Sequence, residues 1–389
     1  MGKRIRTRSR WARGLAGAAV VAAGLAAAGP PASGAPPEAA VAGSYIVTLV
    51  DGASSRAVAA QHAAEHGAQV GFVYEHALNG YAARMAEQAA ARVAADPRVV
   101  RVEPDGVARA VAQALPWGID KIEADVSSTK AGDGTGAVTN VNVYVIDSGV
   151  GTHPDINKVN HVNFAGGKND DCNGHGTHVA GTVAATDNTS DVVGVAPGAP
   201  VTGVKVLGCS GMGSWSGVIK GIDWVTANAK KPAVANMSLG GGANQSVDDA
   251  VKTSAASGVF YALAAGNDGA DACNSSPARA GAGTNNGILT VAATDSADKE
   301  ASWSNYGSCV DIWAPGVSIL STKRGGGTTT MSGTSMASPH GAGGGALYLS
   351  SHTSATPSGV ENALKSAATG TGNYSKDGRP ITRENVATF

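Results

Sequence analysis

The C-terminal two thirds of the chain contain five short runs in which nearly every residue is apolar. Runs of this kind, without polar alternation, are typical of parallel strands that helices cover on both faces. Helical or Gly-rich segments separate the runs, as expected for strand–helix–strand units. We therefore predict an α/β fold with three layers around a parallel sheet between residues 110 and 389. The runs are VNVYVID (141–147), VTGVKVL (201–207), AVANMSL (233–239), VFYALAAG (259–266) and ILTVAAT (288–294).

A different pattern precedes this region, between residues 44 and 105. Here the order of β-rich and Ala-rich segments predicts strand, helix, strand, strand, helix, strand, with the first helix ending at Gly67 and the second at Asp96-Pro97. This order is that of a small βαββαβ unit of the ferredoxin-like type. The segment DGVARAVAQALPWG (105–118) follows with few structural signals, so we predict an exposed linker that is open to cleavage near Ala110.

The first 35 residues have the order of a secretory signal peptide. Six of the first thirteen residues are Lys or Arg, an apolar run extends from Gly14 to Gly29, and small residues and prolines follow. The run is too short and too rich in Ala and Gly to favour a membrane span. A basic nucleic-acid-binding arm would not explain the apolar run. We expect residues 1–35 to be removed, with cleavage between Gly29 and Ala40, and the product to be extracellular.

The balance of charged residues argues against two classes of partner for the exported protein. The 389 residues include 29 basic and 30 acidic side chains, and loss of the six leader residues leaves 23 basic against 30 acidic, a net charge of −7. This balance gives no electrostatic footprint for nucleic acid or for an anionic membrane. We therefore expect neither of these partners, and we expect a monomer.

Four cysteines, all in the later region, predict disulfides in an exported chain. Three pairings are possible, and free buried thiols remain an alternative. Sequential pairing would join residues 37 and 36 positions apart, each bridge contributing roughly 3–4 kcal/mol by loop entropy. No C-x-x-C spacing occurs, which argues against zinc. The cysteines are Cys172, Cys209, Cys273 and Cys309.

Polar residues at strand ends and helix starts are the candidates for chemistry, because ligands bind beyond the carboxyl ends of parallel strands. Asp147 ends an apolar run, His175 lies where a Gly loop opens onto a small-residue helix, Asn267 follows a buried strand, and Ser335 lies at the start of another helix. Each residue alone has an ordinary structural explanation, such as a turn or a helix cap. His178, three residues after His175, lacks the carboxylate of an H-E-x-x-H metal motif, so we expect a packing role.

Together these stretches resemble the subtilisin-like serine peptidases, most closely the proteinase K-like group. The matching motifs, in order, are VIDSGV, NGHGTHVAGT, SLGGG, AAGND and SGTSMASPH, and the likeness covers nearly all of 110–389. Residues 44–109 resemble the inhibitory and folding-assisting propeptide of that family. An esterase of the α/β-hydrolase type would place its serine first, within G-x-S-x-G, whereas here the order is Asp, His, Ser. A non-catalytic binding protein on the same scaffold should have lost at least one of the four site residues, and none is lost. The Gly-rich GDGTGA (132–137) fits neither nucleotide-binding motif.

The resemblance implies a triad in which Asp147 orients His175, His175 takes the proton of Ser335, and Asn267 stabilises the oxyanion. It implies polypeptide substrates, the propeptide as an intramolecular inhibitor, and no cofactor for catalysis. The implied wall of the primary pocket, small and uncharged, favours large apolar or aromatic side chains; the implied edge for an extended peptide is SGMG (210–213). The implied wall residues are Ser238, Leu239, Gly240, Gly241, Ala264, Ala265 and Gly266, and the implied edge residues include Ser210, Gly211 and Gly213.

The resemblance also implies a structural calcium ion. Asp311 would supply the carboxylate, and backbone carbonyls near Asn286 and Ile288 would complete the site; Asp120 and Glu123 are a second candidate. Two features depart from the family pattern. The helix after Ser335 contains Gly341, Gly343, Gly344 and Gly345, each costing about 1 kcal/mol relative to Ala. The tail YSKDGRPITRENVATF (374–389) matches poorly.

Overall fold

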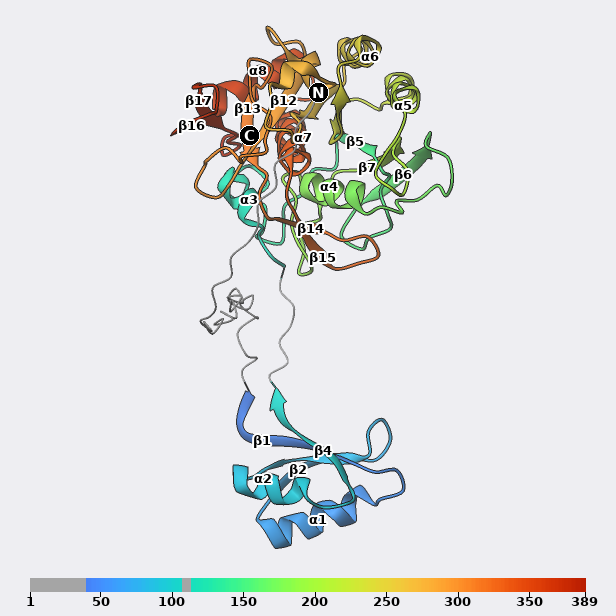
Figure 1. The fold of residues 1–389 in the computed structure, drawn as a ribbon, viewed down its shortest axis with the longest axis vertical. Helices are drawn as coiled ribbons and strands as arrows, with labels where there is room; N and C mark the ends of the chain where they lie inside the picture. Colours follow the sequence, from blue (N-terminus) through green and yellow to red (C-terminus); the bar gives the residue numbers. More distant parts are fainter. Residues whose placement is uncertain (1–39, 107–112) are drawn as a thin grey trace, which may run out of the picture. The chain divides into compact units, whose positions relative to one another are not determined.

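A computed structural model describes residues 40–106 and 113–389, which form two compact units. The predicted signal peptide and the predicted cleavage point near Ala110 lie outside the described residues. Figure 1 shows both units. Within the described residues, no helix combines the length and the apolar character that a membrane span requires.

The N-terminal unit has the predicted βαββαβ order. Its four strands form an antiparallel sheet in the order β2-β3-β1-β4, and both helices contact this sheet and each other. The side chain of Ser54 caps the first helix, which ends at Gly67 in the left-handed region (φ 69°), as the sequence predicted. The elements are β1 (Ala40–Leu49), α1 (Ser55–His66), β2 (Gln69–Tyr74), β3 (Gly80–Arg84), α2 (Glu87–Ala94) and β4 (Val99–Gly106).

This unit has a core of its own, in which Val47, Val58, Tyr81 and Val93 are fully or almost fully buried. In contrast, Phe72 on β2 and Val100 on β4 are 69% and 59% exposed. The sheet therefore leaves apolar side chains uncovered within this unit.

The C-terminal unit is built on a nine-stranded sheet with the order β16-β17-β13-β12-β10-β8-β5-β7-β6. The seven strands from β13 to β6 pair in parallel, and only the β16–β17 hairpin is antiparallel. All five predicted apolar runs form central strands: β5 (Asn142–Asp147), β7 (Val201–Lys205), β8 (Ala233–Met237), β10 (Phe260–Ala264) and β12 (Ile288–Thr294). The others are β6 (Lys158–Asn163), β13 (Ile312–Pro315), β16 (Thr369–Tyr374) and β17 (Pro380–Arg383).

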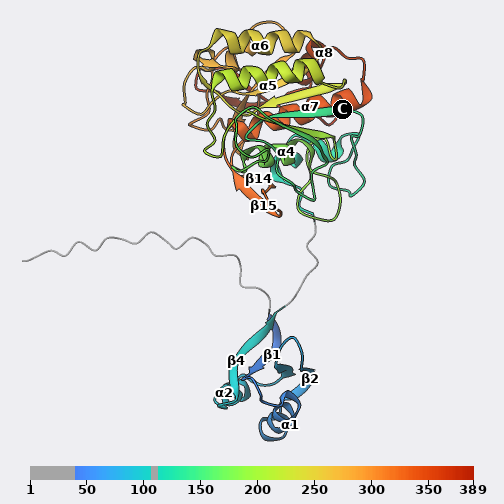
Figure 2. The ribbon, with the colours of Figure 1, turned by 90° about the vertical axis from the view of Figure 1, so that its right-hand side faces the viewer.

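Helices cover both faces of this sheet, which confirms the three-layer prediction (Figure 2). On β5, Val143 and Val145 pack into one core with α4 and α7, and Tyr144 and Ile146 pack into the other with α5 and α6. The first layer holds α4 (His175–Ala184), α7 (Thr334–Ser351) and α8 (Pro357–Ala367), and the second holds α5 (Trp215–Asn228) and α6 (Gln245–Ala256).

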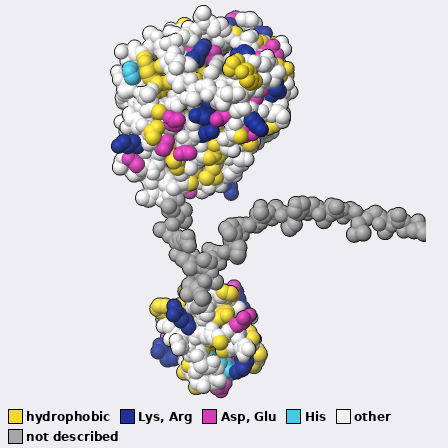
Figure 3. Space-filling model, turned by 90° about the vertical axis from the view of Figure 1, so that its left-hand side faces the viewer, with side chains coloured by type: hydrophobic (Ala, Val, Ile, Leu, Met, Phe, Trp, Pro, Cys, Tyr) yellow, Lys and Arg dark blue, Asp and Glu magenta, His cyan; other side chains and the backbone are white. Residues whose placement is uncertain are grey.

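Shorter elements complete the unit: α3 (Trp117–Lys121), the hairpins β14 (Ile319–Thr322) with β15 (Thr328–Met331) and β9 (Gly241–Gly242) with β11 (Ser275–Ser276), and the 3-10 helices Ala124–Val126, Ala272–Asn274 and Ala278–Gly281. The poorly matching C-terminal tail is ordered, since β17 joins the sheet edge at Trp313. On the face drawn in Figure 3, acidic and basic side chains are interspersed.

The Gly-rich segment at 132–137 has a structural explanation. The backbone N–H groups of Gly132, Gly134 and Gly136 all donate to the carboxylate of Asp187, at 3.0–3.1 Å. A carboxylate of the chain itself therefore occupies the position in which such a loop would bind an anion.

Candidate active site

An aspartate and a histidine form a hydrogen-bonded pair at the carboxyl end of the parallel sheet. Asp147 is the last residue of β5 and is fully buried, and His175 is the first residue of α4. The Nδ1 atom of His175 lies 2.8 Å from Oδ1 of Asp147. Burial alone would lower the pKa of His175, but the charge and hydrogen bond of Asp147, together with the charge of Asp171, raise this pKa above its usual value.

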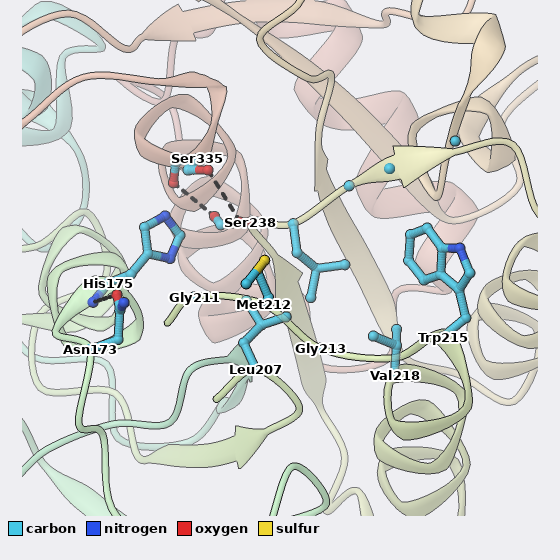
Figure 4. A pocket seen from close by; sticks show the side chains of 14 residues that line it. Asn173, His175, Leu207, Gly211, Met212, Gly213, Trp215, Val218, Ser238 and Ser335 are labelled. Atoms are coloured by element: carbon cyan, nitrogen blue, oxygen red, sulfur yellow. Dashed lines mark hydrogen bonds between the residues drawn. The ribbon is translucent and has the colours of Figure 1, made fainter. Parts of the chain in front are cut away.

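Ser335 shares a cavity with this histidine. It is the second residue of α7, and its side chain and that of His175 line a cavity of about 540 Å³ (Figure 4). The Ser335 hydroxyl donates to the carbonyl oxygen of Ser238 at 3.2 Å, and the Ser238 hydroxyl donates to the Ser335 carbonyl at 2.7 Å. In this arrangement the serine hydroxyl donates to Ser238, and it must be redirected toward His175 before His175 can take its proton.

Asn267 lies beside the start of the same helix. Its Oδ1 accepts hydrogen bonds from the backbone N–H of Thr334 at 2.8 Å and from the Thr334 hydroxyl at 3.0 Å. These bonds hold the carbonyl end of the amide, which leaves the NH₂ group as the end that can donate. The backbone N–H of Ser335 belongs to the first turn of α7, where N–H groups have no partner within the helix. Two donors are therefore available near the serine.

A second buried carboxylate, Asp171, organises the loop before His175, and the sequence analysis missed it. Its two oxygens accept hydrogen bonds from the N–H groups of Asn173, Gly174 and Thr177 and from the hydroxyls of Ser148 and Thr177. The residue at the N-cap position of α4 is Gly174, which has no side chain to cap the helix, so Asp171 supplies the cap. An Asp four residues before His175 was the available signal.

Asp171 is also connected to the Asp147 end of the site. Ser148, which donates its hydroxyl to Asp171, donates its backbone N–H to Asp147 Oδ1 at 2.6 Å. The buried ammonium group of Lys205 donates to the carbonyl oxygens of Ser148 and Leu207 at 2.8 and 2.9 Å. The pair of Asp147 and His175 therefore rests on a buried network of polar groups.

The predicted primary pocket is a cavity of about 270 Å³. Gly240, Ala264, Ala265 and Gly266 line it, and so does Asn267. Ser238, Leu239, Gly240 and Gly241 line the larger cavity that holds His175 and Ser335, so the predicted wall is divided between two neighbouring cavities that share Gly240 and Gly241.

The larger cavity extends to an apolar region that was not predicted. Gly211 and Gly213 line it as expected, but Ser210 is not among its lining residues. Figure 4 shows Trp215 and Val218 on the side of the cavity opposite His175. The large aromatic residue just after the SGMG segment was a usable signal. The lining residues absent from the prediction are Asn173, Leu207, Trp215, Val218 and Gly242.

His178 has a packing role, as predicted. It is fully buried, and its Nε2 atom lies 3.0 Å from the carbonyl oxygen of Ile319 and 3.2 Å from that of Thr329 in the β14–β15 hairpin. Burial lowers its pKa to about 4, so this histidine stays neutral and holds the hairpin to α4.

The four cysteines form two disulfides with the sequential pairing. Cys172 is bonded to Cys209, and Cys273 is bonded to Cys309. The first bridge joins the loop before His175 to the loop before Gly211, and Asn173 reinforces this link by donating to the Cys209 carbonyl at 3.0 Å. It therefore ties together two segments that line the larger cavity.

The predicted calcium site does not fit the residues around Asp311. Its Oδ1 accepts a hydrogen bond from the ammonium group of Lys365 at 3.0 Å, and its Oδ2 accepts one from the Thr290 N–H at 2.8 Å. The side chain of Asn286 is also engaged, since its Oδ1 accepts from the Ile288 N–H. The Lys365 ammonium therefore already places a positive charge against this carboxylate, where the ion was expected. Across the described residues, Asp120 and Glu123 included, no group of three or more His, Cys, Asp or Glu side chains could hold a metal ion.

Comparison with known proteins agrees with this geometry. The model of the subtilase family matches residues 139–383, and that of the peptidase inhibitor I9 family matches residues 44–110. The chain is 44% identical over 325 residues to an alkaline serine exoprotease A of Vibrio alginolyticus, a match that covers 77% of this chain and 57% of that protein. It is 46% identical over 317 residues to an extracellular serine proteinase of a Thermus species, with 78% and 74% covered.

A solved structure of a cold-adapted subtilisin-like serine proteinase is also similar. It superposes with a TM-score of 0.61 at 43% identity, and the match covers 71% of this chain and 98% of that one. The family match spans more than half of the chain, and the Thermus relative is well above 30% identical over most of its length. The chain therefore belongs to the subtilase family of serine endopeptidases and carries an I9 propeptide domain ahead of the peptidase domain.

Proposed function

We propose that the chain is a secreted precursor whose residues 110–389 hydrolyse peptide bonds through an acyl-enzyme formed on Ser335. One observation carries this proposal. The hydrogen-bonded pair of Asp147 and His175, with 2.8 Å between Oδ1 and Nδ1, lies in the same cavity as Ser335 at the start of α7. A hydroxyl, an imidazole and a buried carboxylate in that order are the components of nucleophilic acyl transfer.

In the first half of the reaction, Ser335 Oγ attacks the carbonyl carbon of the scissile bond. His175 Nε2 takes the hydroxyl proton, while Asp147 holds Nδ1–H and stabilises the imidazolium. The negative charge on the carbonyl oxygen is stabilised by the Asn267 NH₂ group and the Ser335 N–H. The C–N bond then breaks as His175 returns the proton to the leaving amine, and an ester on Ser335 remains.

In the second half, water replaces the amine. His175 takes a proton from the water molecule, which attacks the ester, and then returns it to Ser335 Oγ as the C–O bond breaks. The products are a carboxylic acid and the original serine. This mechanism needs no cofactor, because His175 passes each proton that it takes from a nucleophile to the leaving group of the same half-reaction.

We propose broad specificity with a preference for a large apolar or aromatic side chain before the scissile bond. The small walls of the 270 Å³ cavity, Gly240, Ala264, Ala265 and Gly266, carry no charge and leave room for such a side chain. Residues Gly211–Gly213 would pair with an extended substrate as an additional strand. The apolar region at Trp215 and Val218 would receive an upstream apolar side chain.

The N-terminal unit, residues 44–109, would act as an inhibitor and folding aid until the precursor cuts itself close to Ala110. The match of residues 44–110 to the peptidase inhibitor I9 family supports this proposal, and so does the independent core of the unit. We expect export through residues 1–35 and an extracellular monomer.

The proposal is tested by expressing the wild type and Ser335→Ala side by side in a protease-deficient host. We expect the wild type to mature near residue 110 and to digest casein, and the variant to accumulate as full-length precursor with no casein digestion. Processing of the variant at the same bond would contradict self-cleavage, and retained digestion would contradict the role of Ser335.

Specificity is tested on the wild type with matched tetrapeptide anilides that differ only in the residue before the scissile bond. We expect kcat/KM to be at least about tenfold higher with Phe or Leu than with Asp or Lys, because a charged side chain would be desolvated without a partner. Equal values would contradict the proposed pocket.

A further inference from the structure

The C-terminal unit contains a cluster of two buried carboxylates and one partly exposed ammonium group at the start of β12. Asp311 lies directly before β13, and Glu361 and Lys365 lie one turn apart on α8. The Lys365 ammonium is 3.0 Å from Asp311 Oδ1 and 3.1 Å from Glu361 Oε1. The exposed fractions of the two carboxylate side chains are 8% and 0%, so the lysine bridges two groups that water hardly reaches.

The cluster connects three segments that are distant in the sequence. Glu361 Oε2 accepts the backbone N–H groups of Asn286 and Gly287 at 2.6 and 2.8 Å, and Asp311 Oδ2 accepts the N–H of Thr290 in β12. The loop before β12, the start of β13 and helix α8 therefore meet at the same charges. Without a cation between them, Asp311 and Glu361 would be two buried like charges.

A metal ion and this ammonium group would compete for the same oxygen. Calcium binds six to eight oxygens at about 2.3–2.6 Å. An ion on Asp311 Oδ1 would lie no more than about 5.5 Å from the Lys365 nitrogen, given the 3.0 Å contact of that nitrogen with the same oxygen. Two cations at this distance in a buried site repel each other strongly.

We propose that Lys365 is a built-in cation that replaces a metal ion at Asp311, so that this corner of the fold is stabilised without calcium. Because this positive charge belongs to a side chain of α8, it is present whatever the calcium concentration around the protein. The proposal concerns stability, and it stands or falls independently of the catalytic roles proposed above.

The experiment uses the full-length precursor carrying Ser335→Ala, in which self-digestion cannot interfere. Into this chain we would introduce Lys365→Met, Lys365→Arg and, as a matched control, Lys220→Met. Lys220 forms an ion pair of similar length with Asp223, at 2.9 Å, but both side chains are more than 60% exposed. Melting temperatures of the C-terminal unit are measured in EDTA and in millimolar calcium.

We expect Lys365→Met to lower the melting temperature by several degrees in EDTA, Lys365→Arg to recover most of the loss, and Lys220→Met to change little. A Lys365→Met protein as stable as the Lys220→Met control would overturn the proposal.

Calcium counting provides a second readout that does not depend on stability. Bound calcium is measured after gel filtration for the parent precursor and for the same chain carrying Asp311→Asn. We expect the same number of ions per chain in both, because Lys365 and not calcium occupies Asp311. Loss of one calcium ion in the Asp311→Asn protein would show that the metal binds there, and would overturn the proposal.

Discussion

At the scale of single residues, the position of His175 depends on Asp171, a carboxylate outside the proposed triad. Asp171 is fully buried and caps the helix that begins with His175. It accepts the Thr177 N–H at 3.0 Å and the Gly174 N–H at 2.8 Å, so both sides of His175 are fixed to one carboxylate. It is a positioning residue, since it acts on the substrate only through the imidazole.

Asp171→Asn should therefore shift the acid limb of the pH profile. His175 must be neutral to accept the serine proton, so activity is lost as the pH falls through its raised pKa. Asp171 contributes to raising that pKa, and removal of its charge should move the limb of kcat/KM to lower pH. We expect the shift to be smaller than the contribution of Asp147, which unlike Asp171 is hydrogen-bonded to the imidazole.

The control for this measurement is Asp170→Asn, which removes a neighbouring carboxylate that does not bond to the helix start. We expect its profile to match the wild type. If the limb stays in place in Asp171→Asn while kcat falls, Asp171 acts through geometry alone and its electrostatic role is refuted.

At the scale of elements, helix α7 explains why a glycine-rich sequence follows Ser335. A Cβ atom at Gly343 would lie 2.4 Å from the Cβ atom of Val195, and one at Gly345 would lie 2.5 Å from the ring of Phe260. The glycines permit α7 to approach its neighbours closely in the middle of the unit. The close packing that these glycines permit offsets their low helix propensity, and the sequence alone could not show this packing.

Gly343→Ala should destabilise the C-terminal unit, although alanine is the better helix former. The new methyl group would contact the Cβ atom of Val195, which cannot rotate away. We therefore expect the free energy of unfolding to fall by about 1–3 kcal/mol. Gly341→Ala is the matched comparison, since its Cβ would meet the tip of Leu289 at 3.0 Å, and this tip can move. Calorimetry of both variants in the Ser335→Ala precursor provides the measurement. Equal melting temperatures for the two would contradict the packing explanation.

At the scale of the whole molecule, the C-terminal unit buries one carboxylic acid without compensation. Glu384 follows β17, is fully buried against Gly344 of α7, and no described group hydrogen-bonds either of its oxygens. Burial raises the pKa of Glu384 to about 8. The acid that closes the end of the chain onto the central helix is therefore protonated at neutral pH.

This acid should make the stability of the unit dependent on pH. The folded protein keeps a proton that the unfolded chain loses above pH of about 4.5, so the contribution of Glu384 is complete below that pH and is lost as the pH rises through about 8. Glu384→Gln stays neutral throughout and should raise the melting temperature, increasingly so between pH of about 4.5 and about 8, with little further gain above that. The gain is on the order of a few kcal/mol at most.

Melting curves of Glu384→Gln and of the exposed control Asp223→Asn, recorded across that pH range in the Ser335→Ala precursor, provide the comparison. A difference between Glu384→Gln and its parent that does not change with pH would contradict the assignment, because the difference between a neutral group and an ionisable one changes with pH only where the latter titrates.

Much of the fold could be predicted from local patterns. The five apolar runs became central strands because a strand that is covered on both faces needs apolar residues at every position. The ends of those runs also located Asp147 and Asn267, and the small-residue helix starts located His175 and Ser335. The contacts of Asp171 could not be predicted, since its partners Ser148 and Thr177 lie in elements whose approach is a result of packing.

The sequence by itself determined the five central strands of the larger sheet, the two-unit organisation and the polar residues at the strand ends, because these depend on the pattern of neighbouring residues. Only the tertiary structure decided what stands beside each charge. It paired Asp311 with Lys365 where a calcium ion was expected, gathered Trp215 and Val218 into the cavity of Ser335, and buried Glu384 against Gly344. The physical reason is that the pairing and desolvation of a charge depend on residues distant in the chain, which local patterns do not encode.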